Sequence, residues 1–433
     1  MVKGNILLQL AVIVSKCTYL IGQMEQCVVE MEDKLECECD HTNIHCFVTS
    51  SISENDWKDF PHFEYTSLGL SYHSDDNADF FPSPIFSNLR NLEYVYIKGA
   101  KFHRLPQFAM KNLSSLSLLY LDKNSIKNLD NLAISNLNRL TELNIHRNRI
   151  EEVKKGMFQD LPSLVHLNLG YNGIFSVEDE AFSDLRTLTE LRLSWNVLTS
   201  IGSLTFLGLD SLEDLHLDHN RIDNIESTGL SSLVNLRQIW FNANRLTTLH
   251  PGTFNGLQNL VKIILRNNEI DTMSAGTFKN CCQNIERLDL RENNLKTLTK
   301  SWYEPLDFNV SEISFSFSTN SLDCSCDLEW LFELTANDFV AMQLKVTACR
   351  VTSNYPYPGK TIGKFYSLTS VRNESSFCRI EEQAIVLNAG SPIESVLSSN
   401  KFASLSNDIF TLITSVGMSI RTYSTNYSID NVF

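Results

Sequence analysis

Three histidines, His146, His166 and His216, are the side chains of this sequence best suited to bind a metal ion or to sense pH. A transition-metal site needs further histidine, cysteine or carboxylate ligands at a compatible spacing. No such set is completed around these three, whose offsets within the repeat described below are uneven. We therefore predict solvated histidines, with no metal ion and no cofactor.

Motifs for catalysis are also missing from the sequence. The segment PGKTIGK (358–364) has part of a phosphate-binding loop, but Asn354 stands where that loop requires its earlier glycine. There is no HExxH zinc-protease motif, no GxSxG nucleophile motif and no set of protein-kinase motifs. We predict that the protein is not an enzyme.

The cysteines point to an oxidising compartment. Cys17 falls in the N-terminal apolar segment, and eight of the other ten form two clusters: Cys27, Cys37, Cys39 and Cys46, and Cys324, Cys326, Cys349 and Cys378. Disulfides are the better interpretation of both clusters in a secreted chain, and four cysteines allow three pairings each. Cys281 is interpreted as a buried free thiol. A bridge to Cys282, or an intermolecular disulfide through Cys282, is the alternative.

Secretion is predicted from the first residues. Lys3 precedes an apolar stretch, Ile6 to Val14, in the layout of a signal peptide with cleavage near Gly22. No later segment approaches the roughly 20 apolar residues of a membrane helix. Four tripeptides are acceptors for N-glycosylation, at Asn112, Asn309, Asn373 and Asn426. We expect a secreted, extracellular glycoprotein without a transmembrane segment.

Charge narrows the choice of partner. The sequence has 36 basic and 51 acidic side chains, a net charge of −15. Binding to nucleic acid or to an anionic membrane surface requires the opposite balance. Nucleic acid is therefore not expected as a partner.

A regular repeat lies between the cysteine clusters. The pattern LxxLxLxxN occurs eight times, as in LTELNIHRN (140–148), and its asparagine recurs at 124, 148, 172, 196, 220, 244, 268 and 293. Weaker copies occur at 66–73, at 92–100, where Ala100 replaces the asparagine, and at 314–320. Eight matches in one phase identify a repeat architecture, and terminal repeats are commonly irregular.

Each repeat is expected to form one coil of a solenoid. The last two leucines alternate with variable residues, which predicts a short strand with one buried face. The asparagine, at the turn after the strand, can satisfy buried backbone groups with its amide. A second series recurs in the same phase and predicts an apolar spine: Phe86, Met110, Ile134, Phe158, Phe182, Phe206, Leu230, Phe254 and Phe278.

The chain resembles extracellular leucine-rich repeat proteins of the 24-residue type, a group that includes Toll-type receptors, Slit-like proteins and hormone-receptor ectodomains. The resemblance covers about residues 27–378 and rests on the repeats and on two flanking segments, CVVEMEDKLECECDHTNIHC and NSLDCSCDLEWLFEL. It implies an α/β solenoid: a right-handed horseshoe of about 10–11 repeats with a parallel concave β-sheet and disulfide caps at both ends. The implied pairs are Cys27–Cys39, Cys37–Cys46, Cys324–Cys349 and Cys326–Cys378.

The expected domains follow from this resemblance. They are a signal peptide (1–22), an N-terminal cap (23–62), the repeats (63–320), a C-terminal cap (321–378) and a low-order tail (379–433). The caps would cover the first and last leucine layers, which are otherwise exposed.

The concave face is the expected binding site, because its side chains are not needed by the fold. Candidate residues flank the inner leucines: Tyr94, Tyr96, Tyr120, Glu142, His146, His166, Arg192, Trp195, Asp214, His216, Trp240, Lys262, Arg266, Arg287 and Arg291. Aromatic residues and arginine are enriched at binding hot spots. The alternative interpretation is an ordinary solvated sheet, on which Tyr and Trp are good strand formers.

We expect an extracellular protein ligand or receptor as partner, in signalling, adhesion or innate immune recognition. A matrix or scaffold protein is the alternative, and self-association into a homodimer would favour it. The sequence does not name the ligand.

Overall fold

The computed structural model describes residues 27–31, 35–49, 64–72, 80–87, 89–110, 113–278, 280–299, 301 and 314–323. The predicted signal peptide, the four glycosylation sites, nearly all of the C-terminal cap with its cysteines, and the tail lie outside the described residues. Within these ranges, no helix is long and apolar enough to cross a membrane.

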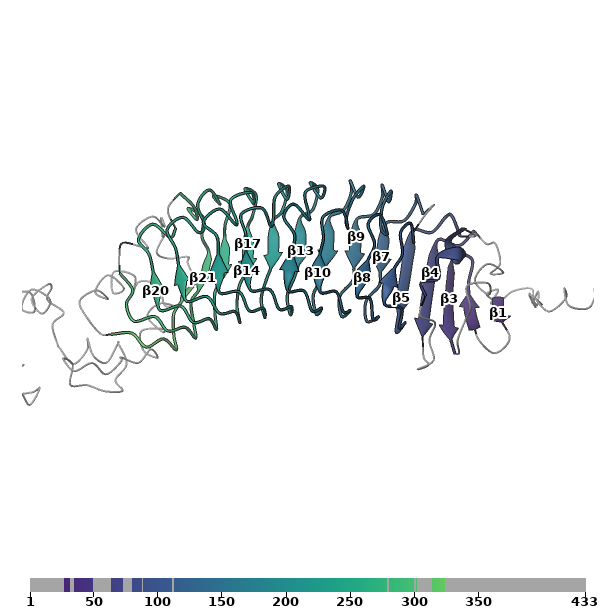
Figure 1. Ribbon diagram of the computed structural model, residues 1–433, viewed down its shortest axis with the longest axis horizontal. Coiled ribbons are helices and arrows are strands. Elements are labelled where there is room, and N and C mark those ends of the chain that lie inside the picture. Colours follow the sequence, from purple (N-terminus) through teal and green to yellow (C-terminus); the bar gives the residue numbers. More distant parts are fainter. Residues whose placement is uncertain are drawn as a thin grey trace, which may run out of the picture.

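One 14-stranded sheet runs the length of an arched solenoid (Figure 1). β1 to β3 are antiparallel, and every pairing from β3 onward is parallel. The strands, in spatial order, are β1 (Cys27–Met31), β2 (Leu35–Cys39), β3 (Asn43–Val48), β4 (Ser67–Tyr72), β5 (Tyr94–Lys98), β7 (Leu118–Tyr120), β9 (Glu142–Asn144), β11 (His166–Asn168), β13 (Glu190–Arg192), β15 (Asp214–His216), β17 (Gln238–Trp240), β19 (Lys262–Ile264), β21 (Arg287–Asp289) and β22 (Ser314–Ser316). The predicted parallel sheet is confirmed, and both irregular end copies take part in it through β4 and β22.

The opposite side of the coils has very little helix. It carries four two-stranded sheets, β6 (Arg104–Leu105) with β8 (Asn128–Leu129), β10 (Glu152–Val153) with β12 (Ser176–Val177), β14 (Ser200–Ile201) with β16 (Asn224–Ile225), and β18 (Thr248–Leu249) with β20 (Thr272–Met273). A 3-10 helix, η1 (Ser83–Ser87), precedes β5. The connections are too short for a stable α-helix, so turns and short strands fill the helical half that an α/β solenoid implies.

The core is a continuous apolar column along the solenoid. The inner leucines and isoleucines are buried in every repeat, and the predicted spine is buried from Phe86 to Phe278. Phe158 stacks on Phe182, and Phe254 on Phe278, with ring centroids 6.1 and 5.5 Å apart. Each coil therefore buries its apolar face against its neighbours rather than against a core of its own.

The repeat asparagines form a ladder of hydrogen bonds, as the sequence predicts. The amide nitrogen of Asn220 donates to the carbonyls of Leu217 and Leu193, at 3.0 and 2.9 Å, and its oxygen accepts the Leu198 N–H at 3.1 Å. The same pattern joins each coil to the one before it from Asn148 to Asn320. These bonds satisfy backbone groups that the turn would otherwise leave unpaired inside the protein.

The residue before each ladder asparagine has a left-handed backbone conformation. Its φ is between +53° and +61° at nine residues with side chains: Lys123, Arg147, Tyr171, Trp195, His219, Ala243, Asn267, Glu292 and Thr319. Gly99, at the same position before Ala100, has a φ of +77°. Left-handed geometry costs a residue with a side chain about 1–2 kcal/mol. At Gly99 a Cβ would lie 2.5 Å from the Tyr72 carbonyl oxygen, so only glycine fits there.

Among the described residues, disulfides occur at two places. Cys37 and Cys46 are bonded, which is the pairing implied by the resemblance, and Cys39 is also disulfide-bonded and lies opposite Cys27 in the β1–β2 register. Cys281 is bonded to Cys282, and both are buried. The interpretation of Cys281 as a free thiol is therefore wrong, because the one-residue insertion of this repeat puts two cysteines side by side in the core.

Candidate functional site

The exposed side of the large sheet is organised in rows that cross the strands. The first row precedes each inner leucine and holds Tyr94, Glu142, His166, Asp214, Lys262 and Arg287; the second follows it and holds Tyr96, Tyr120, Arg192, His216 and Trp240. His146, Arg266 and Arg291 lie two residues after the strand end. Neighbours in a row are cross-strand partners, so each row forms a continuous surface.

Tyrosines occupy the N-terminal end of this face. The rings of Tyr94 and Tyr120 meet edge to face, with centroids 5.5 Å apart, and Lys98 lies over the Tyr96 ring at 5.3 Å. Burial, a hydrogen bond to Glu142 and the Glu142 charge together raise the pKa of Tyr120, so its hydroxyl stays protonated and donates. This end offers aromatic surface with hydroxyl groups.

His146 is separate from the other two candidate histidines. Its Nδ1 lies 3.0 Å from Oδ1 of Asn144, in its own coil. Burial, together with the charges of Arg147 and Lys123, lowers its pKa, although Asp122 opposes them. His146 is therefore neutral at neutral pH.

Glu190 is the centre of the face. Its carboxylate accepts a hydrogen bond from Nδ1 of His166 at 3.1 Å and pairs with the Arg192 guanidinium at 2.5 Å, and Nε2 of His216 lies 3.4 Å away. Side chains of β11, β13 and β15 thus converge on one carboxylate. The repeat places Glu190 on the exposed face, in the same row as His166, but does not predict this convergence. A shallow pocket of about 330 Å³ opens beside it, lined by residues of β9, β11 and β13.

A stack of three side chains continues from this centre. The His216 and Trp240 rings are parallel, with centroids 3.9 Å apart, and Nζ of Lys262 lies 4.4 Å above the Trp240 ring. Burial, followed by the charges of Arg192 and Lys262, lowers the pKa of His216 against the opposing effect of Glu190 and Asp218. Burial, followed by the Arg287 charge, lowers the pKa of Lys262.

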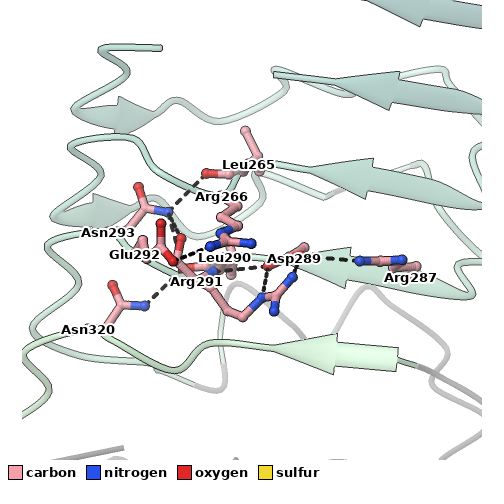
Figure 2. Close-up of polar contacts among 9 residues, drawn as sticks. All are labelled: Leu265, Arg266, Arg287, Asp289, Leu290, Arg291, Glu292, Asn293 and Asn320. Atoms are coloured by element: carbon pink, nitrogen blue, oxygen red, sulfur yellow. Dashed lines mark hydrogen bonds and ion pairs between the residues drawn. The ribbon is translucent and has the colours of Figure 1, made fainter. Parts of the chain in front are cut away.

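Arginines surround a buried carboxylate at the C-terminal end (Figure 2). Arg291 donates from Nε and a terminal nitrogen to Asp289, at 2.8 and 2.5 Å, while Arg287 approaches the same carboxylate only to 3.5 Å. Burial alone would raise the pKa of Asp289, but the hydrogen bonds and charge of Arg291, with the charge of Arg287, lower it. Arg266 pairs with Glu292 at 2.5 Å. Arg266 and Arg291, like Arg192 beside Glu190, are therefore already held by acidic partners.

Trp195 lies outside the strands, at the edge of the face. It has the left-handed backbone that precedes each ladder asparagine, and it is sandwiched between Tyr171 and His219, with centroids 5.1 and 3.8 Å away. Arg147 covers the other face of Tyr171 at 5.1 Å. Tyr171 and Trp195 are both 44% exposed. The sequence analysis missed Arg147, Tyr171 and His219, although all three occur at the position before an asparagine.

Together these groups form a polar and aromatic surface across neighbouring coils. In the described part of the chain, no three His, Cys, Asp or Glu residues are arranged to hold a metal ion. His166 and His216 meet at Glu190, but Arg192 shares that carboxylate. The chemistry on offer is stacking, hydrogen bonding and charge pairing with another molecule.

Known families match the repeat region. Leucine rich repeat matches residues 90–150 and 138–198, and the BspA type Leucine rich repeat region (6 copies) matches residues 175–309. No curated protein sequence matches the chain.

Several solved structures share the fold. An internalin of Listeria monocytogenes is 19% identical over 73% of this chain and 90% of its own, with a TM-score of 0.50. A leucine-rich repeat protein of Leptospira interrogans is 22% identical over 70% of this chain and 75% of its own, with a TM-score of 0.51. A match to an octameric complex of latrophilin 3, Unc5D and the FLRT2 leucine-rich repeats is 24% identical over 75% of this chain and 95% of the matched one, with a TM-score of 0.56.

At these identities the likeness concerns the fold alone. The family matches fall on the coils whose asparagines form the ladder, from Asn124 to Asn293. Sequence and coil geometry agree, and the chain is a leucine-rich repeat protein.

Proposed function

We propose that this protein acts outside the cell and binds another protein on the exposed, concave side of its large sheet. One observation carries the proposal: the connected group His166, Glu190, His216, Trp240 and Lys262 crosses five coils without entering the core. Trp, Tyr and Arg concentrate binding energy when a partner removes them from water. Side chains that the fold does not need, held in fixed positions, are well suited to that role.

The similar structures support a binding role. One of them contains FLRT2 repeats in a complex with latrophilin 3 and Unc5D, so this coil architecture can take part in protein assemblies. The predicted signal peptide and glycosylation sites favour an extracellular setting, and signalling, adhesion or innate immune recognition are the roles we propose.

The test is capture of extracellular proteins by the full-length secreted chain. The parent and a Tyr96→Ala, Tyr120→Ala, Trp240→Ala variant are immobilised and exposed to a library of extracellular proteins. A matched control, Phe108→Ala, Phe175→Ala, Val234→Ala, removes three exposed apolar side chains away from the rows of the sheet face. We expect one or more proteins to bind the parent and the control and to be lost from the aromatic variant.

Two outcomes would contradict this proposal. Binding that survives in the aromatic variant, shown to be folded by its circular dichroism and thermal midpoint, would place the site elsewhere. Binding only of the chain to itself would favour the scaffold function.

A further inference from the structure

Lys262 and Arg287 form an adjacent pair of like charges on this face. They are direct partners in the β19–β21 register. Like charges placed opposite each other on a sheet are destabilising. Burial first, and the Arg287 charge second, lower the pKa of Lys262 from its ordinary value.

Few negative charges of the described residues compensate this pair. Lys262 has no ion pair with any of them, and its counter-charge is Asp214, two strands away on β15. Arg287 reaches only the Asp289 carboxylate, at 3.5 Å, and that carboxylate is taken up by Arg291 at 2.5 Å. Both side chains remain accessible, since Lys262 is partly exposed and the Arg287 side chain is 45% exposed.

An aromatic ring lies beside these cations. In the adjacent row, Trp240 and Ile264 are cross-strand partners, and Lys262 lies over the indole ring. Trp240 is partly exposed, whereas Ile264 is buried, so the indole is the apolar surface next to the cation pair.

We propose that Lys262 and Arg287 bind a carboxylate side chain from an acidic segment of the protein partner, with the adjoining apolar part of that segment on Trp240. A carboxylate relieves the repulsion between the two cations and forms charge-assisted hydrogen bonds with both. This inference rests on the proposed function and specifies the chemistry of the partner.

A protein segment fits better than a polyanionic glycan. The centre of the face carries Glu190 and Asp214, and the whole chain has a net charge of −15. An extended polyanion would be repelled beyond the cation pair, whereas a segment with one or two acidic residues would be attracted locally.

Selection from a phage-displayed library of random dodecapeptides on the full-length protein tests this inference. We expect peptides with Asp or Glu next to an apolar residue to be enriched. Their affinity should fall about tenfold or more in Lys262→Gln, Arg287→Gln, because each loses a charge-assisted bond. The matched control, Arg221→Gln, Arg245→Gln, removes two exposed cations with the same one-coil separation away from the sheet face and should keep the parent affinity.

The conservative exchange Lys262→Arg, Arg287→Lys should restore most of the affinity if charge is the determinant. Enriched peptides without acidic residues, or acidic peptides that bind the Gln variant as well as the parent, would overturn the inference. So would heparin oligosaccharide binding that depends on the two cations while no peptide is enriched.

This result is separable from the capture experiment. A captured protein that is lost from the aromatic variant but retained by Lys262→Gln, Arg287→Gln leaves the proposed function intact and rejects the carboxylate site. A captured protein retained by both variants rejects the proposed function itself.

Discussion

Asparagines two residues apart in the same coil have opposite roles. Asn244 is buried, donates to the Leu217 and Phe241 carbonyls at 2.9 and 3.1 Å, and accepts the Ile222 N–H at 2.9 Å. Asn242 lies on the exposed face, where no hydrogen bond of its side chain is found among the described residues. The ladder thus fixes the coil, while the face, two positions removed, is not needed by it.

Asn244 and Asn242 show that the position of a residue within the coil, and not its type alone, decides its role. The ladder repeats because the same backbone groups need the same partner in every coil. The face does not repeat: it is tyrosine-rich near β5 and β7, mixed around β13, and basic near β19 and β21. The following predictions test this separation.

The largest effect is expected for Asn244→Ala. It leaves the Ile222 N–H without an acceptor and removes one of two amide donors from each carbonyl, at a cost of about 3 kcal/mol in the free energy of unfolding. The matched change Asn242→Ala should cost under about 0.5 kcal/mol. Urea unfolding measures both, and similar values for the two would remove the distinction between ladder and face.

Asp289→Asn should cause the next largest loss in the free energy of unfolding, because Asp289 belongs to the face but is buried. We expect a loss of about 2 kcal/mol at pH 7, since charge-assisted bonds from Arg291 are lost. The pKa of Asp289 is lowered in the folded protein, so its contribution is present above the unfolded pKa near 4 and is lost as pH falls through the lower folded value. Parent and variant should therefore converge in stability towards acid pH, and a difference that persists there would contradict the ion-pair explanation.

His216→Phe should have a smaller effect that depends on pH. The folded pKa of His216 is lowered, so its contribution is present above the unfolded value near 6.5 and is lost as pH falls through the folded value. Phenylalanine keeps a ring beside Trp240 but cannot titrate. The thermal midpoint of the parent should fall more than that of the variant between pH 7.5 and 5. Equal falls would show that protonation of His216 does not contribute to the loss of stability in this pH range.

The smallest effect on the free energy of unfolding is expected for Ala243→Gly, and unlike most substitutions to glycine it should not destabilise the protein. Ala243 has a φ of +57°, which favours glycine, so the substitution should be neutral or stabilise by up to about 1 kcal/mol. Ala275, an exposed turn residue without positive φ, is the control, and Ala275→Gly should destabilise by about 0.5 kcal/mol. Destabilisation by Ala243→Gly would show that the left-handed turn costs little here.

The sequence predicted what every coil needs. The buried leucines, the phenylalanine spine and the ladder amides follow from periodicity, because one physical requirement recurs at a fixed spacing. It did not predict which side chains meet on the face. Glu190 joins His166, Arg192 and His216, while Glu292 and Asp289 hold Arg266 and Arg291. Side-chain reach between neighbouring rows decides these pairs, and periodicity contains no information about it.

The ladder has a mechanical consequence. Its hydrogen bonds join each coil only to the next, so tension applied along the solenoid axis would detach end coils while the middle stays folded. A folded coil adds about 4.8 Å to the length of the sheet, whereas its 24 residues pulled straight span about 80 Å. Under such tension the molecule would lengthen in equal steps and keep the remaining coils intact.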